Sequence, residues 1–137
     1  MANKYIVDLS EVQLSDLELV GGKNASLGEM IQNLSKLGIS IPGGFALTVD
    51  AYWEFINHNK LDNKIRRLIK KMKKDDLVSL KKTGLEIRQL IRNGKWPRQV
   101  KEEIRDSYTL LSQKYGQDIT DVAVRSSATA EDLPDAS

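Results

Sequence analysis

The sequence predicts an α+β fold, mostly helical with a few short strands. Apolar residues recur at positions i, i+3, i+4 and i+7 in several stretches, which is the spacing of one helix face. Three short apolar runs bounded by turn residues, one near each end of the chain and one at residues 45–49, favour strands. The 137 residues match a single domain. With 40% hydrophobic and 29% charged residues, the composition excludes a disordered tail, a collagen-like repeat and a membrane span.

The first third of the chain is predicted to contain a strand and a helix. Residues 4–9 form the strand, and a polar connection follows. A helix is expected from Asn24, because one apolar stripe combines Leu27, Met30, Ile31 and Leu34. Gly38 lies where a left-handed residue commonly ends a helix.

The next elements are a turn, a buried strand and a helix. Residues 39–44 contain a Pro-Gly-Gly turn, and residues 45–49 form the strand. Either Thr48 or Asp50 can cap a helix that continues through Ile56. Trp53, Phe55 and Trp96 are interpreted as packing residues.

Three further helices and a strand complete the prediction. One helix carries the stripe Ile65, Leu68, Ile69 and Met72. Asp75 or Asp76 caps a second helix over residues 77–91. Pro97 suits the first turn of a third helix, which Gly116 ends and whose stripe is Val100, Ile104, Tyr108, Leu111 and Tyr115. Residues 121–127 are expected to form a strand that places an arginine at its carboxyl end.

The composition limits the available chemistry. The chain has no cysteine, which excludes disulfides, a thiolate nucleophile and a cysteine-based zinc site. Its one histidine, His58, has no serine or carboxylate partner nearby in sequence and is interpreted as an exposed residue at a helix end. The formal charge of +2 gives no reason to expect nucleic acid as a partner, and no membrane partner is expected either.

The first candidate site is residues 21–26, Gly-Gly-Lys-Asn-Ala-Ser. Two glycines allow close approach of a ligand to the backbone, and a helix start offers unpaired N–H groups. Lys23 adds a full positive charge, so the segment suits a phosphate. A tight turn before a helix with a surface lysine would explain the same residues.

The second candidate is Arg125 with Ser126 and Ser127, just where the last strand would end. Ligands of open α/β sheets collect beyond the carboxyl ends of strands, and the guanidinium fork suits phosphate oxygens. Pairing of Arg125 with Glu131 or Asp132, to hold the loop, remains the alternative.

A basic run at residues 66–74 is interpreted as a solvated helix face. Its lysines and arginines alternate with apolar residues at helical spacing, and no aromatic residue is interleaved to stack on bases.

Three motifs resemble the amino-terminal nucleotide-binding region of the phosphoenolpyruvate synthase (pyruvate, water dikinase) family. They are VGGKNASLGEM at residues 20–30, IPGGFALT at residues 41–48 and VRSSATAEDLPDAS at residues 124–137. The resemblance covers nearly the whole chain and is looser over residues 61–116. Pyruvate phosphate dikinase and the rifamycin phosphotransferases have a similar front end.

The resemblance implies the first portion of an ATP-grasp type domain in a cytoplasmic enzyme. In this family ATP passes a pyrophosphoryl group to a histidine on another domain of the same chain. One phosphate is released, and pyruvate then becomes phosphoenolpyruvate, with magnesium as a cofactor. By motif, Lys23 and Arg125 are expected to hold ATP phosphates, with Ser126, Ser127 and Thr129 as minor contacts.

The departures from the family pattern are equally informative. His58 does not stand in the Thr-x-His setting of the family's transfer histidine, and the second half of the nucleotide site lies beyond this sequence. We therefore expect residues 1–137 to be a fragment of the nucleotide-binding domain, truncated at its carboxy-terminal end and inactive alone. The alternatives are the ATP domain of a rifamycin-type phosphotransferase or of pyruvate phosphate dikinase, or a stand-alone, non-catalytic nucleotide-binding module.

Overall fold

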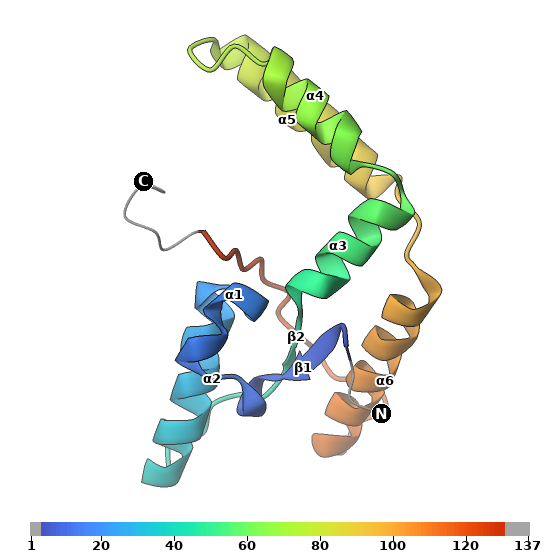
Figure 1. Ribbon diagram of the computed structural model, residues 1–137. Coiled ribbons are helices and arrows are strands. Elements are labelled where there is room, and N and C mark those ends of the chain that lie inside the picture. Colours follow the sequence, from blue (N-terminus) through green and yellow to red (C-terminus); the bar gives the residue numbers. More distant parts are fainter. Residues whose placement is uncertain (1–3, 131–137) are drawn as a thin grey trace. The chain divides into compact units, whose positions relative to one another are not determined.

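The computed structural model describes residues 4–130, and the chain divides into two compact units. The first unit comprises residues 1–51 and 99–137, and the second comprises residues 52–98. Figure 1 labels the main elements. In chain order these are β1 (Ile6–Asp8), α1 (Leu17–Val20), α2 (Gly22–Leu34), β2 (Phe45–Leu47), α3 (Val49–His58), α4 (Asp62–Lys71), α5 (Leu77–Arg92) and α6 (Arg98–Lys114), with short 3-10 helices at Leu9–Glu11, Leu14–Asp16 and Ser35–Leu37.

The sheet of the first unit is an antiparallel pair of three-residue strands, β1 and β2, with Ile6 opposite Leu47. The Leu9 N–H donates to the Gly44 carbonyl at 2.9 Å, just past the end of β1. The two predicted strands are thus present but shorter than expected. Strand β1 ends early because Asp8 caps a 3-10 helix, its carboxylate accepting from the Ser10 N–H at 2.8 Å.

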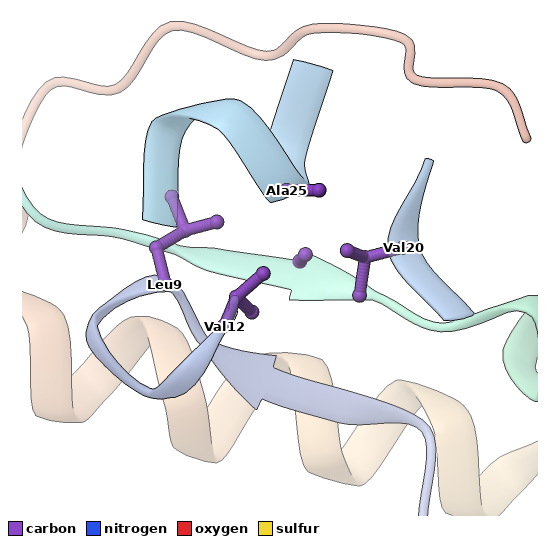
Figure 2. Close-up of a cluster of buried hydrophobic side chains, with 5 residues drawn as sticks. Leu9, Val12, Val20 and Ala25 are labelled. Carbon is purple, nitrogen blue, oxygen red and sulfur yellow. The ribbon is translucent and has the colours of Figure 1, made fainter. Parts of the chain in front are cut away.

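The main core of the first unit joins this sheet to α2. Figure 2 shows Leu9, Val12, Val20 and Ala25 pointing toward one another, and Ala46 of β2 completes the cluster. Val12 and Ala25 have no exposed surface. Burying a valine or leucine side chain contributes about 1.5–3 kcal/mol, so these few residues fix α2 against the strands.

Helix α2 confirms the predicted stripe in part, since Leu27 and Ile31 are partly buried and pack against the core. Its buried residues are the small ones, Gly22, Ala25 and Gly28, whereas Met30 of the expected stripe is 44% exposed. The reason is the close approach of the chain around Val12: a Cβ on Gly28 would lie 2.8 Å from the Val12 Cβ. Large residues cannot occupy that interface, so the apolar stripe turns partly toward solvent.

Helix α6 packs on the amino-terminal end of β1 and the start of α3. Val100 is fully buried and clusters with Tyr5 and Ala51, and Ile104 packs against them. The helix ends at Lys114, and Gly116 just beyond it has a φ of 65°, as expected for the left-handed residue that follows a helix. The predicted stripe is confirmed here except at Tyr115, which is 47% exposed and whose hydroxyl accepts from the Gly43 N–H at 2.8 Å.

The second unit is built from the rest of α3 and a hairpin of α4 and α5. Phe55, Ile56 and Leu61 form its core, with Ile65 and Leu90 packed against it. The predicted caps are confirmed. Thr48, in the first unit, accepts from the Ala51 N–H at 3.3 Å at the start of α3, and Asp76 accepts from the Val78 N–H at 2.9 Å at the start of α5.

The aromatic residues of the second unit pack as expected. The rings of Phe55 and Trp96 lie 5.1 Å apart, and Trp53 packs edge-on against Tyr52 while remaining 40% exposed.

The prediction of a strand at residues 121–127 is wrong. These residues form no strand in the described part of the chain, and Val124 is 93% exposed. A strand needs a hydrogen-bonded neighbour, and the sheet of the described residues contains β1 and β2 alone. The α+β class is confirmed, with a single two-stranded sheet among residues 4–130. Within those residues, no helix combines the length and apolar character that a membrane crossing requires.

Candidate functional site

The site begins where α1 passes into α2 at Gly21. This residue has a φ of 81° and a ψ of 160°, a conformation available essentially to glycine. Its N–H donates to the Leu17 carbonyl at 2.9 Å, and its carbonyl accepts from the Ala25 N–H at 3.0 Å. Gly21 therefore closes α1 and opens α2, which starts at Gly22, two residues earlier than predicted.

The segment around Ser127 lies directly against this turn. The Gly22 N–H donates to the Ala128 carbonyl at 3.3 Å. A Cβ on Gly21 would lie 2.9 Å from the Ala128 nitrogen and would collide with the Ser127 hydroxyl oxygen. The two candidate segments, about 100 residues apart in sequence, are thus in contact, and the absence of a side chain at Gly21 permits it.

A groove of about 360 Å³ opens beside this contact. It is lined by Gly22, Lys23, Asn24, Ser26, Leu27, Met30 and Arg125. Four of these residues, Lys23, Ser26, Leu27 and Met30, follow i, i+3, i+4 and i+7 spacing and so share one face of α2. Lys23 and Arg125, the two predicted phosphate contacts, line the same groove.

The groove has two chemically different ends. Lys23 and Ser26 belong to the first turns of α2, where the helix carries a partial positive charge, and Arg125 adds a second full charge. Leu27 and Met30 make the other end apolar. An anion with an attached uncharged group would match this division.

The remaining predicted site residues lie outside the groove lining. Ser127 is half buried beside Gly21, and its hydroxyl has no hydrogen-bond partner among the described residues. Ser126 and Thr129 are exposed. Glu131 and Asp132, the alternative partners of Arg125, lie outside the described residues.

Two lining residues, Leu27 and Met30, were not predicted as site residues, whereas Asn24 and Ser26 belong to the first candidate segment, residues 21–26. Leu27 and Met30 were assigned to a core stripe, and Ser26 lies one turn after Lys23. The signal for Leu27 and Met30 was available as helical spacing counted from Lys23 instead of from Leu27. Asn24 was the expected helix start, and its side-chain amide donates to the Val20 carbonyl at 2.9 Å across the turn.

These residues fit the phosphate end of a nucleotide. Two cationic side chains, a helix N-terminus and a buried serine hydroxyl without a partner are groups that phosphate oxygens satisfy. Within residues 4–130, no three acidic or histidine side chains gather into a group that could hold a metal ion. The described residues thus offer groups that could hold an anion.

The other sequence candidates stand apart from this groove. His58 is exposed at the last residue of α3, as predicted. The basic run of residues 66–74 is also solvated as predicted, since all its lysines and arginines are exposed.

Comparison with known proteins assigns the chain to a family. The family model described as "Pyruvate phosphate dikinase, AMP/ATP-binding domain" matches residues 17–137. A phosphoenolpyruvate synthase of Aquifex aeolicus is 54% identical over 129 residues, which are 94% of this chain and 15% of that protein. Phosphoenolpyruvate synthases of Pseudomonas aeruginosa and Escherichia coli are 48% and 44% identical, over 98% and 93% of this chain and 17% and 16% of their own lengths.

The chain thus spans about a sixth of the length of these curated relatives. The resemblance inferred from the three sequence motifs is confirmed. The chain belongs to the pyruvate phosphate dikinase AMP/ATP-binding domain family, and its relatives are phosphoenolpyruvate synthases.

Proposed function

We propose that this chain forms the phosphate-binding wall of the ATP site in a phosphoenolpyruvate synthase. The observation that carries the proposal is the placement of Lys23 and Arg125 on one groove at the amino-terminal end of α2. Support comes from the family match, whose description names AMP and ATP, and from relatives with the name of this enzyme.

The proposed roles follow from the chemistry of phosphoryl transfer. Such reactions require little covalent help from a protein beyond positioning and neutralisation of oxygens as charge moves. The Lys23 ammonium acts as a point charge on the phosphate chain, while the Arg125 guanidinium donates in a planar fork. The Ser127 hydroxyl can donate to an oxygen that reaches the turn, and Ser126 and Thr129 are minor contacts at its edge.

The whole reaction needs parts of a longer protein. We propose that ATP transfers a pyrophosphoryl group to a histidine on another domain, and that pyruvate, water and ATP yield phosphoenolpyruvate, AMP and phosphate. An ATP-grasp type site would supply the magnesium carboxylates from outside residues 4–130, and such an enzyme would act in the cytoplasm. Residues 1–137 alone would bind ATP weakly and would not complete the reaction, because they provide one wall of the cleft.

The test replaces each cation in the full-length protein and measures single-turnover transfer to the histidine. Loss of a charge-assisted contact costs about 2–4 kcal/mol, so Lys23→Ala and Arg125→Ala should each slow transfer about 30- to 1000-fold. Lys36→Ala and Arg105→Ala are matched controls, since both residues are exposed and neither lines the groove. Unchanged rates in both groove variants would refute the assignment.

The same experiment separates the alternatives. A non-catalytic nucleotide-binding module would bind ATP in a Lys23-dependent way without labelling any histidine. A rifamycin-type phosphotransferase would label the histidine but pass the phosphoryl group to an antibiotic instead of pyruvate.

A further inference from the structure

The two units carry opposite charge, which the small net charge of the chain conceals. The second unit, residues 52–98, contains fourteen lysines and arginines against five carboxylates, a formal charge of +9. The rest of the chain contains seven lysines and arginines against fourteen carboxylates, a formal charge of −7. A positive potential is therefore concentrated on one helical unit that takes no part in the proposed nucleotide site.

A groove runs along the hairpin of α4 and α5, which lie side by side in Figure 1. It has a volume of about 460 Å³ and is lined by Lys64, Arg67, Leu68, Lys71, Glu86, Gln89, Leu90 and Asn93. The three cations lie on α4 at i, i+3 and i+7 and so follow one side of the groove. Leu68 and Leu90 are half buried, which leaves apolar surface between the charged and amide side chains.

The hairpin also exposes several large apolar side chains beside its charged ones. Leu77 and Val78 are 71% and 75% exposed at the start of α5, and Ile69, Leu85 and Ile91 are between 40% and 50% exposed. Residues 61–95 contain no aromatic side chain. The surface therefore combines aliphatic patches with positive charge and has no aromatic ring on which a base could stack.

We propose that the α4–α5 groove docks an acidic amphipathic helix of a partner protein. Leucine-like residues of that helix would cover Leu68 and Leu90, and its carboxylates would meet Lys64, Arg67 and Lys71. Charge complementarity selects this partner and speeds its encounter with the hairpin. Glu86, on the α5 side of the groove, repels carboxylates there and so sets the orientation of the bound helix.

Two other polyanions fit the surface less well. A nucleic acid would satisfy the cations but would leave the aliphatic surface of Leu68 and Leu90 without a complementary group, because Arg67 is the one lining residue with a face on which a base could stack. An anionic membrane is flat on this scale and cannot enter a groove between two helices. The acidic helix uses both the charge and the apolar floor.

The test measures binding of defined probes to the full-length protein by fluorescence anisotropy at 150 mM salt. The first probe is an 18-residue peptide of leucine, glutamate and alanine with one apolar face, and the second has the same composition in scrambled order. An oligouridine of 20 nucleotides and phosphatidylserine vesicles serve as competing probes. Tighter binding of the amphipathic peptide than of the other three is the expected result.

Variants locate the binding on the hairpin. The groove variant combines Lys64→Gln, Arg67→Gln and Lys71→Gln, and the control variant combines Lys73→Gln, Lys74→Gln and Lys82→Gln. Both remove three positive charges, but the control residues do not line the groove. Since each exposed charge pair contributes modestly and three such pairs are lost, the groove variant should bind the peptide about tenfold or more weakly, and the control within about threefold of the wild type.

A second variant keeps the test decisive if the first disturbs the helix. Gln89→Glu with Asn93→Asp adds negative charge on the α5 side without removing a cation, and it should also weaken peptide binding about tenfold. Equal weakening in the groove and control variants would overturn the proposal, as would preferential binding of the oligouridine, the vesicles or the scrambled peptide. Unchanged nucleotide affinity and circular dichroism in each variant establish that the fold is intact.

Discussion

Replacing Gly21 by alanine tests the geometry that brings together the two segments of the proposed phosphate site. The added Cβ would lie 2.9 and 3.0 Å from the Ala128 nitrogen and carbonyl carbon, and closer still to the Ser127 hydroxyl oxygen. Ordinary contacts of a Cβ begin at about 3.4 Å. Gly21→Ala should therefore force residues 127–128 away from α2.

The expected loss can be worked out from that displacement. Clearing the Ser127 oxygen requires a movement of about 1 Å, and Arg125 stands two residues before it. A misplacement of this size commonly costs about 100-fold in a positioned reaction. For binding, losing a hydrogen bond to a charged group costs about 1.5–3 kcal/mol, so affinity for an ATP analogue should fall about 10- to 150-fold.

The matched control is Gly38→Ala. Gly38 also has a positive φ, 78°, but a Cβ there would meet no atom within 4 Å. Gly38→Ala should therefore lower the stability of the fold by about 1–2 kcal/mol, the cost of placing a side chain on left-handed backbone, without adding a clash. Calorimetry of an unreactive ATP analogue with both variants of the full-length protein gives the comparison. If Gly21→Ala binds within threefold of Gly38→Ala, the contact between the two segments does not position Arg125 and the reasoning is wrong.

Two further predictions concern single side chains. Ser127→Ala should raise the stability of the nucleotide-free domain by about 1 kcal/mol, because it removes a buried hydroxyl that has no partner among the described residues, yet weaken binding of the ATP analogue. Urea midpoints and calorimetry measure the two opposite effects, and a loss of stability would contradict the first. Asp76→Ala should accelerate amide hydrogen exchange in the first turn of α5 about fivefold, since a lost cap costs about 1 kcal/mol. Asp75→Ala is the control for that cap, and equal acceleration in both variants would contradict the assignment.

The helices could be predicted because their signals are local. The caps at Thr48 and Asp76 and the left-handed glycines Gly38 and Gly116 each concern residues within a few positions of one another. Their hydrogen bonds form inside one segment, so the sequence around them carries the information. The two 3-10 helices and α1 before Gly21 were missed, because turns of three or four residues are too short for a periodic signal.

The elements that were predicted wrongly depend on distant partners. Residues 121–127 have an apolar pattern typical of a strand, but a strand exists only where a neighbour supplies hydrogen bonds. In the same way, Met30 has the spacing of a core residue and is 44% exposed, because the close approach of Val12 to Gly28 places the small residues of α2 deepest in the core. Sequence periodicity predicts that a segment is helical, whereas tertiary packing determines how deeply each residue of its apolar stripe is buried.

The candidate site was predictable for a different reason. Lys23 and Arg125 each stand in a segment whose residue types suit phosphate, and both segments were identified before any geometry was known. That they line one groove depends on Gly21, whose missing side chain admits Ser127 and Ala128. The opposite charges of the two units show the limit of such inference. The net charge of +2 is the sum of a unit with a charge of +9 and a remainder with a charge of −7. The boundary between the two units follows from the contacts of the folded chain, so the overall composition does not show this difference. A binding surface for anions can thus be present in a chain whose overall charge gives no reason to look for one.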